Sequence, residues 1–343
     1  MNTGYKKLVD ALLPWYAENR RQLPWRADRD PYHIWVSEIM LQQTRVEAVK
    51  EYYIRFLQEL PTVQDLAACE DGRLHKLWEG LGYYSRVRNL KKAAQVIVET
   101  YDGIFPRECE LVLALPGIGA YTAGAICSIC FDLPTPAVDG NVLRVIARIT
   151  DDATPIDMPA YKKQVQEQLA EIYPNRAGDF TQALMELGAT VCGPNRKPDC
   201  SNCPCKAFCL AFSRNTAEQL PVKLPKKQRR LEEKTVFVLH CDGRYALAKR
   251  PQKGLLAGLW QFPDVRGILD VQQALSAVES MGIRPAQLQR QIDRTHVFTH
   301  VQWNMRGYYL DVQNTAGDFV WMTAEQVAQE AALPTAYRQF WDI

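Results

Sequence analysis

The sequence predicts a two-domain protein, in which an all-α domain is followed by a smaller α+β domain. Three observations support this fold class. The length of 343 residues suits two domains. Apolar residues recur at helical spacing through residue 190, whereas beyond residue 233 the apolar period changes to two, as in half-buried strands. Between these halves, residues 214–233 contain two prolines and many charges, which is typical of a linker.

In the predicted helical domain, 1–213, capping residues, prolines and glycines mark where helices begin and end. Asp30-Pro31 predicts the start of a helix that carries its apolar side chains through Leu41. Thr44 to Glu47 has the pattern of a capping box and predicts a helix that ends near Pro61. Further helices are expected after Ser85, Gly119 and Asp139, and over about 159–172 and 177–190.

The predicted second domain, 234–343, mixes strands and helices. Asp242-Gly243 lies between two stretches of alternating apolar and polar residues, which predicts a β-hairpin. Further strands are expected at 294–303 and 306–313, and helices near 268–281 and 323–332.

Charge and hydropathy narrow the class of protein. The net charge of +2 decides nothing, but nine Lys or Arg face two acidic residues between Gly193 and Arg230. This local surplus suits a polyanion such as DNA, or a solvated linker. The sequence has no apolar run long enough for a transmembrane helix and no signal-peptide pattern. We therefore expect a monomer of the cytoplasm that does not bind membranes.

Five of the ten cysteines crowd into residues 192–209, and this clustering predicts a metal site rather than disulfides. The spacing Cys192-x7-Cys200-x2-Cys203-x5-Cys209 offers four thiolates with no interleaved histidine. This donor set suits a 4Fe–4S cluster or a four-cysteine zinc site, and the single CxxC after helical sequence favours the cluster. Cys205, a fifth thiol, is able to replace Cys203 in a rearranged site. Cys127 and Cys130 form a second CxxC on an apolar helix, where core packing is the better reading.

Two glycines in the segment 111–126 predict a hairpin between two helices. Gly117 and Gly119 permit a tight turn with positive φ, and their amide groups can face a phosphate. Alone, this GxG pattern is also compatible with an ordinary tight turn between helices.

Two carboxylates stand out as candidates for acid and base chemistry. Asp139 precedes a predicted helix, where it either only caps the helix or is also kept ionised so that it stabilises a developing cation. Glu38 lies among Trp35, Val36 and Ile39, so it is expected to be buried, neutral and able to donate a proton. The alternative for Glu38 is a surface position on its helix.

Together these segments resemble the endonuclease III superfamily of DNA glycosylases and, within it, the A/G-specific adenine glycosylase (MutY) family. The segments that carry the resemblance are LPWR at 23–26, WVSEIMLQQTRV at 35–46, WEGLGYYSRVRNL at 78–90, LPGIGAYTAGAI at 115–126, VDGNVLRV at 138–145, LLAGLWQFP at 255–263, HVFTH at 296–300 and the cysteine cluster. One departure is the seven residues between Cys192 and Cys200, where the family commonly has six.

The resemblance implies a helix–hairpin–helix glycosylase with a 4Fe–4S cluster, which flips adenine out of double-stranded DNA and hydrolyses its glycosidic bond. The adenine would be opposite 8-oxoguanine or guanine. Glu38 would protonate the base, Asp139 would stabilise the sugar cation, and Tyr121 and Asn141 would orient this centre. Tyr121 occupies the position where the lyase branch has a lysine, which implies a monofunctional enzyme. The candidate DNA-binding residues are Arg26, Gln43, Thr44, Tyr83, Gly117, Gly119, Arg196 and Lys197.

The second domain resembles a Nudix domain of the MutT type, chiefly through residues 259–263. The run of acids that a Nudix hydrolase needs for magnesium is missing after Pro263. The resemblance therefore implies a domain that recognises 8-oxoguanine, with Phe298, Thr299 and His300 in the recognition loop.

Three other functions remain as alternatives at this point. A pyrimidine-specific glycosylase with lyase activity is disfavoured by Tyr121 and by the second domain. A Nudix hydrolase is disfavoured by the missing acids. An iron–sulfur DNA-binding redox sensor would explain the cysteines and the basic loop, but it would leave Glu38 and Asp139 without a role.

Overall fold

The computed structural model describes residues 3–194, 197–225 and 228–341, and it divides into two compact units. The first unit comprises Met1–Ala68 and Arg88–Pro225, and the second comprises Cys69–Val87 and Lys226–Ile343. The predicted boundaries at 213 and 234 stay predictions, but the contacts assign Cys69–Val87, a segment of the predicted helical domain, to the unit that contains the sheet.

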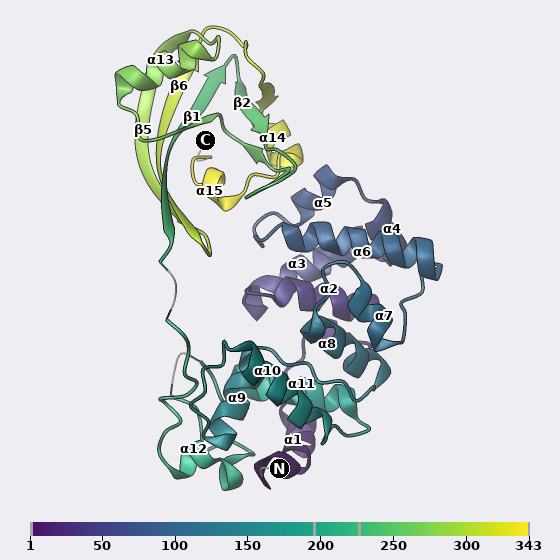
Figure 1. Ribbon diagram of the computed structural model, residues 1–343. Helices are drawn as coiled ribbons and strands as arrows, with labels where there is room; N and C mark the ends of the chain where they lie inside the picture. The colour runs from purple at the N-terminus through teal and green to yellow at the C-terminus, as the bar shows by residue number, and fades with distance from the viewer. Residues whose placement is uncertain (1–2, 195–196, 226–227, 342–343) are drawn as a thin grey trace. The chain divides into compact units, whose positions relative to one another are not determined.

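The first unit is helical in its described residues (Figure 1). Its helices are α1 Thr3–Asn19, the short 3-10 helix η1 Pro24–Arg26, α2 Pro31–Leu41, α3 Val46–Glu59, α4 Val63–Ala68, most of α6 Ser85–Tyr101, α7 Cys109–Ala114, α8 Ala120–Phe131, α9 Gly140–Thr150, α10 Pro159–Ala170, α11 Ala177–Thr190, the 3-10 helix η2 Lys206–Phe208 and α12 Leu210–Ser213. One buried core of this unit joins α1, α9, α10 and α11 and includes Cys205.

Helix starts agree with the local signals at two sites that matter for function. Asp30 caps α2, where its side chain accepts from the amides of Tyr32 and His33, and Asp139 caps α9 in the same way. The predicted capping box at Thr44 is wrong. The N-cap of α3 is Arg45 without a side-chain bond, and the Thr44 hydroxyl instead donates to the Gln42 carbonyl at 3.4 Å.

The second unit is built on a mixed sheet with the strand order β3-β2-β1-β6-β5, to which β4 and β7 add by pairing with β1 and β2. The strands are β1 Arg230–Cys241, β2 Arg244–Lys249, β3 Trp260–Gln261, β4 Asp264–Arg266, β5 Pro285–Val297, β6 Val301–Val312 and β7 Val320–Thr323. The helices of this unit are α5 Asp71–Leu77, the first turn of α6, α13 Val271–Ser280, α14 Ala324–Glu330 and α15 Thr335–Arg338.

Two cores cover opposite faces of this sheet. Apolar side chains of α13 pack on one face, whereas α14 and α15 pack on the other (Figure 1). The predicted hairpin at Asp242-Gly243 joins antiparallel β1 and β2, while β1 and β6 are parallel. The predicted break near residue 304 is wrong, because β5 and β6 turn at residues 298–300 and β6 runs unbroken through Met305. The β1 strand also begins at Arg230, inside the predicted linker.

Within the described residues, no helix combines the length and the apolar character that a membrane span requires.

Candidate active site

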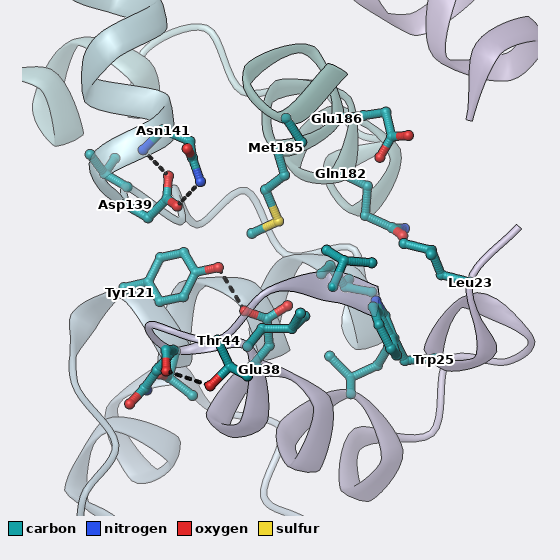
Figure 2. A pocket seen from close by; sticks show the side chains of 18 of the residues that line it. Leu23, Trp25, Glu38, Thr44, Tyr121, Asp139, Asn141, Gln182, Met185 and Glu186 are labelled. Atoms are coloured by element: carbon teal, nitrogen blue, oxygen red, sulfur yellow. Dashed lines mark hydrogen bonds between the residues drawn. The ribbon is translucent and has the colours of Figure 1, made fainter. Parts of the chain in front are cut away.

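A cavity of about 800 Å³ opens in the first unit and contains both candidate carboxylates. Its wall is formed by η1, α2, the turn after α2, the start of α8, the start of α9 and α11. Figure 2 shows Glu38 and Tyr121 pointing toward one another in this cavity, with Asp139 and Asn141 beside them. The structure therefore brings together all four residues that the sequence predicts to be catalytic.

Glu38 is buried in α2, with an exposed fraction of 6%, so the surface alternative is wrong. The Tyr121 hydroxyl donates to Glu38 Oε2 at 2.6 Å. Burial raises the pKa of Glu38 to about 7, and the Asp139 charge adds to this effect, while the Tyr121 hydrogen bond and Arg26 oppose it. Near neutral pH, Glu38 is thus able to exist as a protonated acid and as a carboxylate base.

Asp139 is held by hydrogen-bond donors at the start of α9. Its Oδ1 accepts from the amides of Asn141 and Val142, at 2.9 and 2.8 Å, and its Oδ2 accepts from Asn141 Nδ2 at 2.8 Å. The positive end of the α9 dipole also lies at this carboxylate. Asp139 is therefore a helix cap whose carboxylate also lines the cavity.

A buried ion cluster in the cavity wall was missed by the sequence reading. Glu186 on α11 has a fully buried side chain, and it binds Arg21 Nε at 2.6 Å and Arg26 Nη2 at 2.7 Å. Burial raises the pKa of Glu186, but the hydrogen bonds from the two arginines outweigh it and bring the pKa below its usual value. The sequence did contain a signal for Glu186, the same one that identified Glu38: a glutamate within an apolar helical stretch. Arg26, which the sequence predicts to contact DNA, thus forms an ion pair with Glu186 in the wall of the cavity.

The turn after α2 lines the same cavity. Gln43 has a left-handed backbone with φ 59°, which is uncommon for a residue other than glycine. Its side chain is exposed, and Thr44 beside it is half-buried. Such backbone strain is typical of functional sites, and it supports the predicted role of this turn in contacting DNA.

The predicted hairpin lies between α7 and α8. Gly117 has φ +77°, and a Cβ there would lie 2.5 Å from the Cβ of Asn89, so this position requires glycine. Gly119 is the N-cap of α8 with φ −98°, so of the two glycines only Gly117 takes the positive φ that such a turn permits. Its place at the N-terminus of α8 still fits the predicted amide contact with a phosphate.

The five clustered cysteines surround one small cavity of about 20 Å³ in the first unit. Cys205 is buried and the other four are partly buried. Burial raises the pKa of Cys192, and Arg148 Nη1, which donates to its sulfur at 3.2 Å, opposes this effect only in part. In the described part of the chain, no group of three or more His, Cys, Asp or Glu side chains is arranged to hold a metal ion. The donor chemistry at this cavity is that of four or five thiols with a nearby cation.

Hydrogen bonds join this cysteine loop to the catalytic centre. Arg144, buried in α9, donates from Nε to the Cys192 carbonyl at 2.9 Å and from Nη2 to Asn141 Oδ1 at 3.0 Å. Because Asn141 in turn donates to Asp139, Arg144 and Asn141 connect Cys192 to the carboxylate.

The predicted basic loop is only partly described. Lys197 is exposed and pairs with Glu218 at 3.4 Å, and it lines a second cavity of about 950 Å³ that also includes Asp139 and Gln43. Arg196 lies outside the described residues. A polyanion in this second cavity would therefore lie next to Asp139, the candidate catalytic carboxylate.

The predicted recognition loop is the turn between β5 and β6. The Phe298 ring packs between His296 and Trp303, with centroid distances of 4.5 and 4.8 Å. Thr299 and His300 are exposed at the tip of the turn. The Thr299 hydroxyl lies 3.1 Å from the Tyr83 hydroxyl, so two predicted DNA-facing residues from distant parts of the sequence meet within the second unit.

Comparisons with known proteins agree with this organisation. Residues 36–175 match the HhH-GPD superfamily of base excision DNA repair proteins, and residues 235–342 match the NUDIX domain. The chain is 36% identical over 394 residues to adenine DNA glycosylase of Mus musculus, which covers 96% of this chain and 76% of that protein. It is 32% identical to the adenine DNA glycosylase of Buchnera aphidicola subsp. Acyrthosiphon pisum, and the match covers 84% of this chain and 82% of that protein.

Among solved structures, a thermostable thymine-DNA glycosylase is 30% identical, with a TM-score of 0.56 over 62% of this chain and 98% of that chain. A trapped endonuclease III–DNA intermediate, 23% identical with a TM-score of 0.52, shows the same fold over 62% of this chain and 98% of that chain. The predicted fold class and the resemblance to the endonuclease III superfamily are thereby confirmed. The chain belongs to the adenine DNA glycosylases, helix–hairpin–helix enzymes of base excision DNA repair that hydrolyse N-glycosidic bonds.

Proposed function

We propose that this enzyme excises adenine opposite 8-oxoguanine, and also opposite guanine, and that it does so as a monomer without strand cleavage of its own. One observation carries this proposal: a single cavity contains both Glu38, whose pKa burial raises to about 7, and Asp139, whose carboxylate accepts hydrogen bonds from the start of α9. An adenine must leave the duplex to reach such a cavity, and flipping costs about a few kcal/mol.

Glu38 and Asp139 would divide the chemistry between them. Protonated Glu38 transfers its proton to N7 of the flipped adenine, which makes the base a better leaving group. The glycosidic bond then breaks through an oxocarbenium-like state, and Asp139 stabilises the positive charge on the sugar. Glu38, now a carboxylate, accepts a proton from the water that attacks the sugar. Tyr121 orients Glu38, and Asn141 orients Asp139.

The direct test uses a duplex with one adenine:8-oxoguanine pair. We expect abasic sites that yield strand breaks only after alkali, because Tyr121 cannot form the imine that a lysine would provide. Breaks without alkali at the rate of base release would contradict the monofunctional assignment, and trapping with borohydride would report the imine. Release of thymine or oxidised pyrimidines in place of adenine would contradict the proposal itself.

We also propose that Cys192, Cys200, Cys203 and Cys209 hold a 4Fe–4S cluster. The thiols around one cavity and the absence of histidine from the motif support this choice over zinc. When bound, the cluster would cross-link the loop 192–209 and hold Lys197 toward phosphates. The chain's own contribution is the guanidinium of Arg148, which donates a hydrogen bond to the sulfur of Cys192.

Replacing the cluster ligands should remove iron. Serine at position 192, 200, 203 or 209 should each lower the iron content from about four atoms per chain and weaken absorption near ~400 nm. Cys205→Ser is the matched control and should keep the iron. Iron content by elemental analysis decides the result, and zinc at one atom per chain after anaerobic purification would contradict the cluster assignment.

The second unit would supply recognition of the base opposite adenine, through Phe298, Thr299 and His300. A Thr299→Ala, His300→Ala double variant should lower the preference for adenine opposite 8-oxoguanine over adenine opposite guanine. One polar contact to a base edge typically contributes about 1–3 kcal/mol of discrimination, so the preference should fall about tenfold or more. Single-turnover excision on both duplexes measures it. An unchanged ratio would remove this loop from recognition.

A further inference from the structure

The segment Cys69–Val87 leaves the helical unit and is assigned by its contacts to the unit that contains the sheet. Its helix α5 lies beside α14 (Figure 1). This assignment is unexpected from the sequence, because helices of the first unit precede and follow the segment directly along the chain. The contacts that fasten it are therefore of functional interest.

Two charged side chains of this segment bind the backbone just after α14. Glu79 Oε1 accepts from the amide of Leu333 at 3.0 Å, and Lys76 Nζ donates to the carbonyl of Ala331 at 3.4 Å. Lys76 and Glu79 also pair with each other at 2.7 Å, with side-chain exposures of 25% and 13%. Leu333 itself is 2% exposed. The hydrogen bond between a carboxylate and a buried amide is stronger than an ion pair at the surface, because little water competes for the buried amide.

The same segment carries Tyr83, whose hydroxyl meets Thr299 in the turn between β5 and β6. The stretch between Glu79 and Tyr83 is held by its own bonds. The indole of Trp78 donates to the Gly82 carbonyl at 3.1 Å, and Arg86 donates to the carbonyls of Leu81 and Gly82 at 2.8 and 3.1 Å. Because this turn is internally braced, a contact that fixes Glu79 also fixes Tyr83 relative to the sheet.

We propose that Glu79, supported by Lys76, is a positioning residue for recognition of the base opposite adenine. Glu79 and Lys76 form a latch that seats Tyr83 against the recognition turn Phe298–His300. This inference rests on the proposed function of that turn. Glu79 is not among the residues that line the active-site cavity, so its loss should alter selectivity and leave the chemistry of excision intact.

The experiment compares Glu79→Ala, Glu79→Gln and a control in the full-length protein. Glutamine keeps an oxygen that can accept from Leu333, whereas alanine leaves this buried amide without the carboxylate. Glu167→Ala is the matched control, because Glu167 also pairs with a lysine, Lys163, but both side chains are exposed, at 66% and 78%. Single-turnover excision is measured on adenine:8-oxoguanine and adenine:guanine duplexes, with hydrogen exchange of the Leu333 amide as a second readout.

For Glu79→Ala we expect the preference for the 8-oxoguanine duplex to fall about tenfold, the size typical for loss of one charge-assisted hydrogen bond. Excision from the guanine duplex should stay at the parent rate, and exchange at Leu333 should become faster. Glu79→Gln should recover most of the preference, and Glu167→Ala should match the parent in all three measurements.

The outcomes separate this inference from the proposed function. A parent enzyme without any preference for 8-oxoguanine would contradict the proposed function, and unchanged Leu333 exchange in Glu79→Ala would independently contradict the latch. A parent preference that Glu79→Ala leaves intact would overturn the positioning role even if exchange rises. Equal losses on both duplexes would also overturn it, because they would indicate general destabilisation.

Discussion

Glu38→Gln should reduce single-turnover excision of adenine by at least about 10²–10⁴-fold, the range that general acid–base catalysis contributes. Glutamine preserves the size of the side chain and can still accept from Tyr121, but it has no proton to transfer at neutral pH. Duplex binding should persist, because Glu38 is buried in the cavity and its replacement leaves the exposed basic residues unchanged. The measurement is product formed per enzyme at saturating enzyme concentration.

The control for this change is Glu47→Gln, which alters an exposed glutamate of α3 that pairs with Lys50 at 2.9 Å. It should excise adenine at the parent rate. Excision by Glu38→Gln within tenfold of the parent would remove Glu38 from the role of acid.

The pH dependence of the parent enzyme follows from the same residue. Because burial raises the pKa of Glu38 to about 7, the protonated acid is present below that pH and is lost as the pH rises through it. The rate of base release should therefore fall on the alkaline side with a midpoint near this value, and Glu38→Gln should lack this dependence. Tyr121→Phe should move the midpoint upward, since the phenol hydrogen bond favours the ionised carboxylate.

Asp139→Asn should be the other severely impaired variant. The amide retains the ability to cap α9, so the helix and the duplex affinity should survive. It removes the negative charge that faces the developing sugar cation, and loss of one such electrostatic contribution typically costs about 10²–10³-fold in rate. Single-turnover excision together with the thermal midpoint of unfolding separates the chemical effect from the structural one.

Asp270→Asn is the matched control for Asp139→Asn, since Asp270 also caps a helix, α13, but is exposed on the second unit. Both changes should shift the unfolding midpoint little, and only Asp139→Asn should lose activity. If Asp139→Asn excised adenine at the parent rate, its carboxylate would be no more than a cap.

The positions of Glu38 and Asp139 depend on residues of the cavity wall that the sequence alone did not reveal. The Glu186 carboxylate with Arg21 and Arg26 fixes one side of the cavity, and the Arg144 contacts fix the position of Asn141. These groups act through the placement of others, so their replacement is expected to have smaller effects than that of Glu38 or Asp139.

The sequence by itself determined the features that depend on a few neighbouring residues. Asp139 caps α9 because a carboxylate before a helix finds the free amides two and three residues later. Asp242-Gly243 forms a hairpin because both residues take positive φ, which that turn requires. The motifs were equally decisive for the family, since their spacing is read directly along the chain.

Only the tertiary structure decided the properties that depend on distant segments. The pKa of Glu38 is raised by burial, because α3, α8 and η1 pack against α2, and no local pattern reports how completely they exclude water. The capping box at Thr44 failed because Gln43 takes a left-handed backbone at the cavity, where tertiary contacts override local preference. The segment Cys69–Val87 groups with the sheet, where its helix α5 contacts α14 and where Lys76 and Glu79 bind backbone 255 and 254 positions further along the chain. Hydrogen bonds across such separations carry no periodicity, so only the folded chain reveals them.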